Sequence, residues 1–217
     1  MVQLPPIMSL RDIVMGEGAG VLHFGEHPVT REKLDAINAL TNFDMQQPHY
    51  ERIKTGDRGD AHDMWKLALR TDILGIEDHL PNIVNQIVPI IGSEEMFSIY
   101  REVDPLARTL RKIQINLLEQ GGVIGNHIDR GSNPQWLMVC VLQLSKQYLG
   151  GEYVIVHPTD GEKKFKPTYG SLLIARTDVK HWINPVTAGI RKTLVYFVGM
   201  DSEPNYNGPM LVKPSGN

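Results

Sequence analysis

The stretch Gly125-Asn126-His127-Ile128-Asp129 governs the interpretation of this 217-residue chain. His127 and Asp129 are two residues apart, and in an extended strand that spacing turns both side chains to the same face. A second imidazole, His181, lies in the segment 171–198, whose pattern predicts a strand, a turn and another strand. Two histidines and one carboxylate are the ligand set of the facial triad that holds non-haem Fe(II). We therefore predict that His127, Asp129 and His181 meet at one metal site.

A guanidinium and a hydroxyl follow in the apolar segment 191–198. Arg191 and Thr193 are also two residues apart, so on a strand they point to one side. Burying a guanidinium is unfavourable unless an anion pairs with it, and its planar fork matches a carboxylate. This segment therefore predicts an inward-facing binding site for a carboxylate.

In this order, an H-x-D motif, a distant His and then an Arg resemble the Fe(II)/2-oxoglutarate-dependent dioxygenases, and in particular their prolyl 4-hydroxylase-like branch. The resemblance covers 113–198 and includes Asn116, the Gly-Gly-Glu-Tyr run at 150–153 and the Tyr-Gly-Ser-Leu run at 169–172. One departure is Leu118, which stands where many of these enzymes have a tyrosine that touches 2-oxoglutarate.

The resemblance implies a fold, a reaction and a set of ligands. The fold is mainly β with N-terminal helices: a double-stranded β-helix, or jelly-roll, with helices packed on one face. The metal triad would hold Fe(II) and be the catalytic centre, while Arg191, Thr193 and Asn116 would bind the co-substrate 2-oxoglutarate. With O2, such an enzyme hydroxylates an unactivated C–H bond, here expected on an amino-acid side chain, free or in a peptide or protein. Ascorbate would serve as a reductant.

Two further arginines are candidates for binding a substrate carboxylate. Arg176 ends the apolar strand predicted at 171–176, and Arg130 directly follows the metal carboxylate. An arginine that faces water at the rim of the barrel fits the same pattern, so both interpretations stay open. Asn116 equally fits a structural asparagine near a strand end.

Composition excludes several classes of protein. A formal net charge of −3 gives no electrostatic case for nucleic acid or an anionic membrane. The single cysteine, Cys140, lies in an apolar run, so no disulfide can form within the chain. The N-terminus lacks the pattern of a signal peptide, and no apolar run is long enough to span a bilayer. We expect a cytoplasmic protein whose partners are O2 and a small-molecule or amino-acid substrate.

Periodicity predicts helices in the first half of the chain and strands in the second. Helices are predicted over 31–40 with Thr30 as N-cap, over 61–74, over 80–91 with a bend or interruption near Pro89, and over 94–100. Strands are predicted at 19–24, 111–118, 123–129, 136–144, 152–156, 163–166, 171–176, 179–183 and 191–199. The segment 1–18 reads as an irregular lead, and 42–60 as a long polar loop that is a candidate lid.

We expect a single domain over 1–217, because this length suits one β-barrel with added helices. Residues 1–110 would form a helical support and the lid loop, 111–199 the double-stranded β-helix core, and 200–217 a tail. His62 and Asp63 fall in the predicted helix 61–74, where adjacent side chains diverge, so we expect no second metal motif there.

Rival functions use parts of the same pattern. A non-oxygenase, cupin-like metal-binding β-barrel could hold another divalent ion with the same ligands, but it needs no inward carboxylate clamp such as Arg191. Related enzymes that transfer chloride have a small residue where Asp129 stands, so hydroxylation is favoured over halogenation. The oligomeric state and the choice among a free amino acid, a protein residue and another metabolite are left open.

Overall fold

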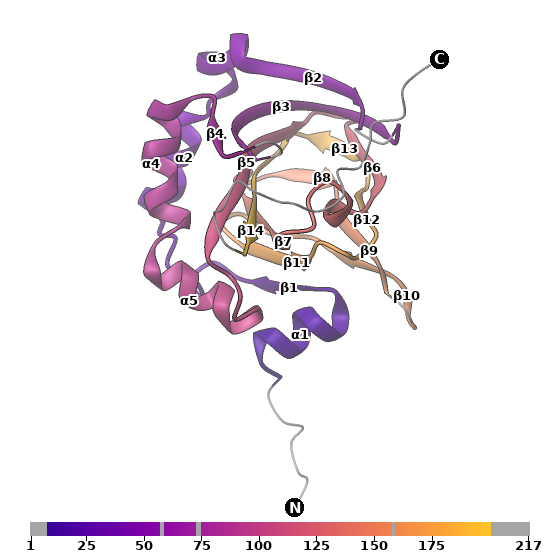
Figure 1. Cartoon of the computed structure of the whole chain (residues 1–217). Helices are drawn as coiled ribbons and strands as arrows, with labels where there is room; N and C mark the ends of the chain where they lie inside the picture. Colours follow the sequence, from indigo (N-terminus) through magenta and orange to yellow (C-terminus); the bar gives the residue numbers. More distant parts are fainter. Residues whose placement is uncertain (1–7, 57–58, 73–74, 158, 201–217) are drawn as a thin grey trace, which may run out of the picture.

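The computed structural model describes residues 8–56, 59–72, 75–157 and 159–200 (Figure 1). Of the predicted tail at 200–217, only residue 200 is among the described residues. The helices are α1 (Leu10–Glu17), α2 (Arg31–Leu40), α3 (Phe43–Gln46), α4 (Pro81–Ile91) and α5 (Glu94–Val103), with 3-10 helices η1 (Gln47–His49) and η2 (Asp129–Gly131). The strands before α5 are β1 (Ala19–Leu22), β2 (Tyr50–Thr55), β3 (Ala61–Thr71) and β4 (Glu77–Asp78). Those after it are β5 (Thr109–Leu118), β6 (Val123–His127), β7 (Trp136–Gln143), β8 (Tyr148–Gly150), β9 (Tyr153–His157), β10 (Gly161–Phe165), β11 (Leu172–Arg176), β12 (His181–Ile183), β13 (Val186–Gly189) and β14 (Arg191–Gly199).

Strand β3 joins the two sides of a nearly closed barrel. The strands pair in the order β1-β11-β7-β14-β5-β3-β6-β12-β9-β10, while β2 and β4 add to β3, and β8 pairs with β13. From Trp65 onward β3 pairs antiparallel with β5, whereas His62 and Asp63 pair with β6. The predicted double-stranded β-helix is confirmed, and the first 110 residues contribute strands to it as well as helices (Figure 1).

Alternation along β14 separates a core under the helices from the inside of the barrel. Leu194 and Tyr196 pack with the helices, and the Tyr196 hydroxyl lies 2.8 Å from that of Tyr100 in α5. Val195 and Phe197, in the opposite phase, belong to a second apolar cluster. Figure 1 shows α2, α4 and α5 along one side of the barrel, which confirms helices on one face. Among the described residues, no helix combines the length and apolar character needed to cross a bilayer. The cytoplasmic location stays a prediction.

The predictions for the helices were only partly correct. Helix α2 begins after Thr30, whose hydroxyl accepts the Lys33 N–H at 3.4 Å, as predicted. Helix α4 continues through Pro89 to its end, so there is no interruption, and the alternative of a bend stays a prediction. The predicted irregular lead is wrong over α1, because Ser9 caps this helix and Gly18, with φ of 85°, ends it in the left-handed conformation.

The predicted helix at 61–74 and the predicted loop at 42–60 are also wrong. Residues 61–71 form β3, and the preceding segment contains α3, η1 and β2, which pairs with β3 as a hairpin. The apolar positions Met64, Leu67 and Leu69 suit either period over so short a segment. Pairing with β2, β5 and β6 decides for the strand, because it satisfies backbone hydrogen bonds on both edges. The lid role of this region stays a prediction.

The strands predicted from 111 onward occur, with shifts of a few residues at their ends. One shift concerns the site: the strand predicted at 123–129 ends at His127, and Asp129 begins η2. The short strands β8 and β13 were not predicted, because they are three and four residues long and lack an apolar alternation.

Candidate active site

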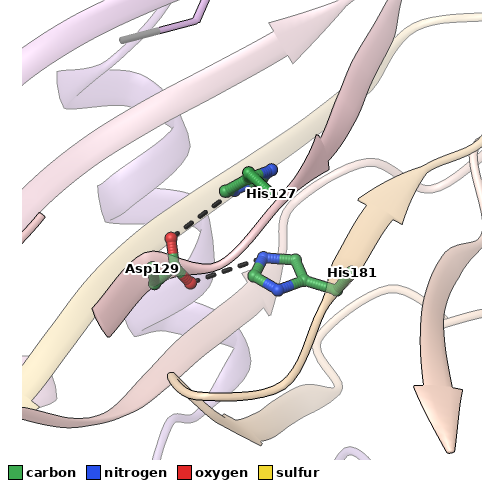
Figure 2. Close-up of side chains that lie close together, drawn as sticks. All are labelled: His127, Asp129 and His181. Atoms are coloured by element: carbon green, nitrogen blue, oxygen red, sulfur yellow. Dashed lines mark ion pairs between the residues drawn. The ribbon is translucent and has the colours of Figure 1, made fainter. Parts of the chain in front are cut away.

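Two paired strands bring the histidines together. His127 ends β6, His181 begins β12, and the antiparallel register places them directly opposite, so their side chains share a face. Their ring centroids are 4.3 Å apart. Ile128 keeps an extended conformation before η2, which returns the Asp129 side chain to the same point. The Asp129 carboxylate oxygens lie 3.5 Å from His127 Nε2 and 3.4 Å from His181 Nε2 (Figure 2).

Backbone contacts set the tautomers of both histidines. His127 Nδ1 lies 2.7 Å from the Gly125 carbonyl and His181 Nδ1 lies 3.0 Å from the Val179 carbonyl. Because a carbonyl only accepts, each Nδ1 donates, which leaves Nε2 of each ring as the nitrogen available to bind a metal. Asp129 Oδ2 is buried and has no hydrogen-bond partner among the described residues. The three ligand atoms lie within 4.8 Å of one another, a donor set that fits a divalent metal such as Fe(II).

Arg191 is buried with unused hydrogen-bonding capacity. Its side chain begins β14, the residue is 1% exposed, and Nε and Nη2 have no hydrogen-bond partner within the described part of the chain. The hydroxyl of Thr193, which is fully buried, has none either. Lys192 points the other way and donates to the Asn38 carbonyl at 3.3 Å, as strand alternation requires. Buried donors without acceptors are costly, so this position fits an anionic ligand.

One cavity of about 190 Å³ contains both features. Its lining includes the metal triad and Arg191, together with Asn116 from β5. Asn116 lies opposite Thr193 in the β5–β14 register, and its side-chain oxygen accepts a 2.7 Å hydrogen bond from the Gln114 amide. Asn116 thus reaches the cavity where it was predicted, although its contact with 2-oxoglutarate stays a prediction.

Comparison with known proteins shows which family the chain resembles. No protein-family model matches it. It is 28% identical over 104 residues to a PKHD-type hydroxylase of Idiomarina loihiensis, and this match covers 46% of the chain and only about half, 47%, of that protein. A solved oxidoreductase of the 2OG-Fe(II) oxygenase family from Burkholderia pseudomallei is 25% identical, with a TM-score of 0.75 over 89% of this chain and 90% of that one. In sequence and in fold, this chain is therefore similar to the 2-oxoglutarate–Fe(II) oxygenases.

Two prolyl hydroxylases share the fold of this chain. The Pseudomonas putida prolyl-4-hydroxylase has a TM-score of 0.64 at 14% identity, covering 89% of this chain and 97% of that one. The Trichoplax adhaerens prolyl hydroxylase, solved with a peptide of hypoxia inducible factor, has a TM-score of 0.67 at 11% identity, covering 89% and 88%. The resemblance to the prolyl 4-hydroxylase-like branch is confirmed. Fe(II) and 2-oxoglutarate are the metal and co-substrate that this similarity and the His-Asp-His cluster imply.

The electrostatics of the His127, Asp129 and His181 triad suit metal binding. Burial alone would raise the pKa of Asp129, but the charge of His181 and the hydrogen bond from His127 outweigh it and hold that pKa below its usual value. Burial opposes the proton on His127, yet Asp129 outweighs it and raises that pKa. For His181 burial prevails and lowers the pKa. At neutral pH the carboxylate is therefore ionised and His181 neutral, which are the forms that bind metals.

Two tyrosines near Arg191 were not predicted as site residues. Tyr153 of β9 stacks on the His181 ring, with centroids 5.0 Å apart, and its buried hydroxyl has no partner among the described residues. The Tyr148 hydroxyl lies against Arg191 and also donates to the Pro167 carbonyl at 2.9 Å. Leu118, the departure from the family pattern, lies opposite Arg191 in the β5–β14 register. The hydroxyl groups near Arg191 thus come from Tyr148 of β8 and Tyr153 of β9, whereas the family pattern places a tyrosine in β5, at the position of Leu118.

A buried carboxylate positions one wall of the cavity. Asp72 Oδ2 accepts hydrogen bonds from Arg111 Nε at 2.7 Å and from Trp136 Nε1 at 2.9 Å. Trp136 stacks on Phe197 with centroids 4.0 Å apart, and both rings line the cavity. Because a buried acceptor fixes the indole, this apolar wall keeps a defined shape beside the metal site.

Neither arginine predicted to bind substrate lies in the cavity. Arg176 donates to both carboxylate oxygens of Asp178, at 2.9 and 2.7 Å, and to the Met15 carbonyl at 3.2 Å. Arg130 is exposed, and its backbone N–H donates to the Thr177 carbonyl at 2.8 Å. Both lie outside the lining, so the interpretation as rim residues is the one that their placement supports.

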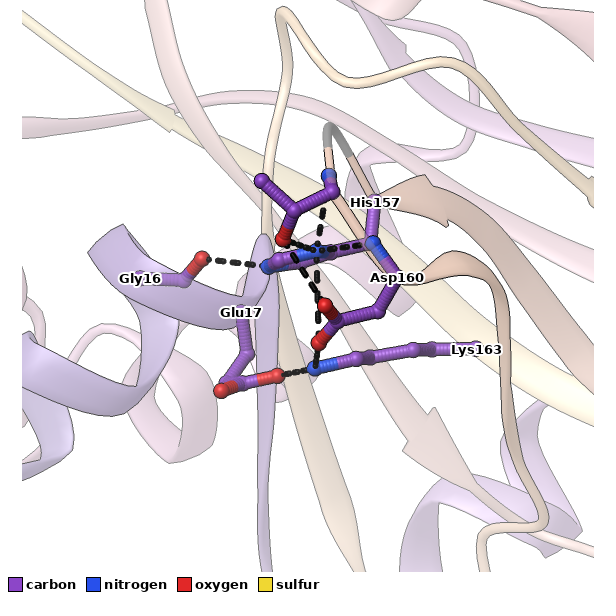
Figure 3. A network of polar contacts seen from close by, with 6 residues as sticks. Gly16, Glu17, His157, Asp160 and Lys163 are labelled. Carbon is purple, nitrogen blue, oxygen red and sulfur yellow. Dashed lines mark hydrogen bonds and ion pairs between the residues drawn. The ribbon is translucent and has the colours of Figure 1, made fainter.

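A second cluster of potential ligands, Glu17, His157 and Asp160, ties α1 to the β9–β10 hairpin (Figure 3). His157 uses both ring nitrogens: Nε2 donates to the Gly16 carbonyl at 3.0 Å, and Nδ1 accepts the Asp160 N–H at 3.1 Å. The Lys163 ammonium pairs with both Glu17 and Asp160. The Lys163 ammonium thus supplies the positive charge that a metal ion would otherwise bring, and the cluster is structural.

Proposed function

We propose that this protein is an Fe(II)- and 2-oxoglutarate-dependent dioxygenase that hydroxylates an unactivated C–H bond of an amino-acid side chain. The observation that carries the proposal is Arg191, a buried guanidinium with unused donors in the same cavity as the His-Asp-His cluster. A cupin-like metal barrel explains the cluster but not these donors. Similarity to the 2-oxoglutarate–Fe(II) oxygenases and the hydroxylase relative support the reaction class.

The place of each residue in the cavity determines its proposed role. His127, Asp129 and His181 would hold the metal from one side, leaving its other positions toward the cavity. Arg191, with Thr193, would bind the far carboxylate of 2-oxoglutarate and so orient its keto acid end toward the metal. When bound, Fe(II) and 2-oxoglutarate supply the oxidising power from O2, with succinate and CO2 as co-products.

The apolar wall performs the remaining task, the exclusion of water. Val139, Val141 and Val195 join Trp136 and Phe197 on the lining. These side chains offer no hydrogen bonds to solvent apart from the indole N–H, which Asp72 already accepts. They surround the substrate with groups that exclude water and so limit side reactions.

The test is turnover with defined components. Protein loaded with Fe(II) and ascorbate is incubated with 2-oxoglutarate, O2 and a panel of free amino acids and short peptides, and succinate and a mass gain of one oxygen are measured. We expect substrate-dependent succinate from wild type and none from His181→Ala. Absence of saturable 2-oxoglutarate binding to the metal-loaded protein would overturn the proposal in favour of the cupin-like function.

A further inference from the structure

The β2–β3 hairpin carries a third histidine, His62, into the cavity beside His127 and His181. Alternation along β3 separates adjacent residues: His62 lies opposite Ile124 of β6 and lines the cavity. Asp63 faces outward, where it pairs with Arg52 and with Lys54. The register of β3 against β6, and not a metal motif at 62–63, therefore brings an imidazole to the site.

His62 lies beside the triad without belonging to it. Its ring centroid is 5.8 Å from that of His127. The described ligand group at this place comprises only His127, Asp129 and His181. His62 is therefore positioned to contact a molecule that occupies the cavity next to the metal, and the proposed reaction assigns it no role.

Asp60 accompanies His62 at the same wall. Its Oδ2 lies 3.0 Å from His62 Nδ1, and the side chains are only 15% and 11% exposed. The hydrogen bond from the Gly56 N–H to the Asp60 carbonyl, at 2.8 Å, holds this end of the hairpin. The carboxylate and imidazole atoms are close but not aligned for a hydrogen bond, and neither has another such partner among the described residues. Both keep bonding capacity in a buried place, where leaving it unused is costly.

This pair has a definite chemical preference. A carboxylate accepts hydrogen bonds, and a neutral imidazole whose Nδ1 proton faces the carboxylate accepts at Nε2. An ammonium group satisfies acceptors and the negative charge together. The cavity also contains a cation beyond Arg191: Lys66, on the same face of β3, has its ammonium 4.0 Å from a carboxylate oxygen of Glu51. Charges of both signs thus line the space beside the metal.

We propose that Asp60 and His62 form an amine subsite, which binds the ammonium group of a free amino acid as the substrate. The inference rests on the proposed function and selects among the substrates that it leaves open. A residue inside a polypeptide has no free α-ammonium group, so its backbone would leave Asp60 without a counter-charge. A free amino acid offers the ammonium to Asp60 and His62 and a carboxylate to the cationic side.

The test measures binding without turnover. Protein loaded with Mn(II) is first titrated under argon with 2-oxoglutarate alone, and then with the standard L-amino acids and their N-acetyl derivatives by calorimetry. We expect at least one amino acid to bind at least about tenfold more tightly than its N-acetyl form, since charge-assisted hydrogen bonds are lost. Asp60→Asn and His62→Phe should remove this preference while leaving the affinities for Mn(II) and 2-oxoglutarate within about twofold of wild type.

The control is His79→Gln. His79 is an exposed histidine that contacts Thr71 and lies away from the lining, so this variant should keep the full preference. Intact 2-oxoglutarate binding with no amino acid preferred over its N-acetyl form would overturn the amine subsite alone. Equal weakening of both ligand forms in Asp60→Asn would do the same. Failure of wild type to bind 2-oxoglutarate would overturn the proposed function and this inference with it.

Discussion

Replacing Arg191 by methionine should raise the stability of the free protein and reduce the stabilisation that 2-oxoglutarate provides. In the free protein, Nε and Nη2 are buried without hydrogen-bond partners among the described residues, and burial lowers the pKa of this guanidinium. An unsatisfied buried donor costs about 1–3 kcal/mol, so an apolar side chain of similar length should raise stability by about that amount. For a chain of this size, roughly 2–4 °C in Tm accompanies each kcal/mol.

With 2-oxoglutarate, wild type should gain more stability than Arg191→Met. Wild type at a ligand concentration of about 100 Kd gains about 2.7 kcal/mol. Loss of the charge-assisted hydrogen bonds should weaken binding by about ten- to a hundredfold, so at that concentration Arg191→Met gains only about 1.4 to 0.4 kcal/mol. The 2-oxoglutarate-dependent rise in Tm should thus fall from about 5–11 °C to a few degrees or less.

The assay is differential scanning calorimetry of Mn(II)-loaded protein at pH 7, with and without 2-oxoglutarate. Lys192→Met is the matched control, because it removes a cation from the adjacent position of β14 that faces the helices. This control should keep the full ligand-dependent rise in Tm. An undiminished rise in Arg191→Met would refute the assignment of Arg191 as the carboxylate site.

Four further outcomes are expected. Calorimetric titration should show that His181→Ala abolishes stoichiometric Mn(II) binding, whereas His157→Gln, in the structural cluster, retains it; undiminished binding in His181→Ala would remove the triad. Burial lowers the pKa of Lys192 to about 8 from 10.5 in the unfolded chain, so the unfolded state binds the extra proton. The free energy of unfolding of wild type relative to Lys192→Met should therefore rise by on the order of 2 kcal/mol between pH 8 and 9.5 in urea titrations, and a parallel pair of curves would contradict this. Asp72→Ala should cost about 3–5 kcal/mol of unfolding free energy, since it breaks a buried charged pair, and a loss below about 1 kcal/mol would show that the pair is dispensable. Trypsin should cut after Lys54 more slowly when Mn(II), 2-oxoglutarate and a bound amino acid are present together, if the β2–β3 hairpin acts as a lid; equal rates would leave it a fixed wall.

The sequence by itself determined the chemistry and much of the C-terminal half. Spacings of two at 127 and 129 and at 191 and 193 predict shared faces without knowledge of the partners, because strand alternation is a local property. The cap at Thr30 located α2 for the same reason, since one side chain satisfies a local backbone donor. The order of the metal residues and Arg191 indicated the superfamily before any contact was known.

Tertiary structure decided the first half of the barrel and the substrate side of the cavity. The segment 61–71 suits both a helix and a strand by its apolar spacing, and β3 exists because β5 and β6 supply partners for its backbone. That same pairing turns the His62 side chain into the cavity, which the helix predicted for this segment gave no reason to expect. Tyr153 is likewise a site residue only because β9 pairs with β12 and stacks its ring on His181. Pairing between strands that are distant in sequence depends on which sheet edges meet during folding. The local spacing of apolar residues does not indicate these partners.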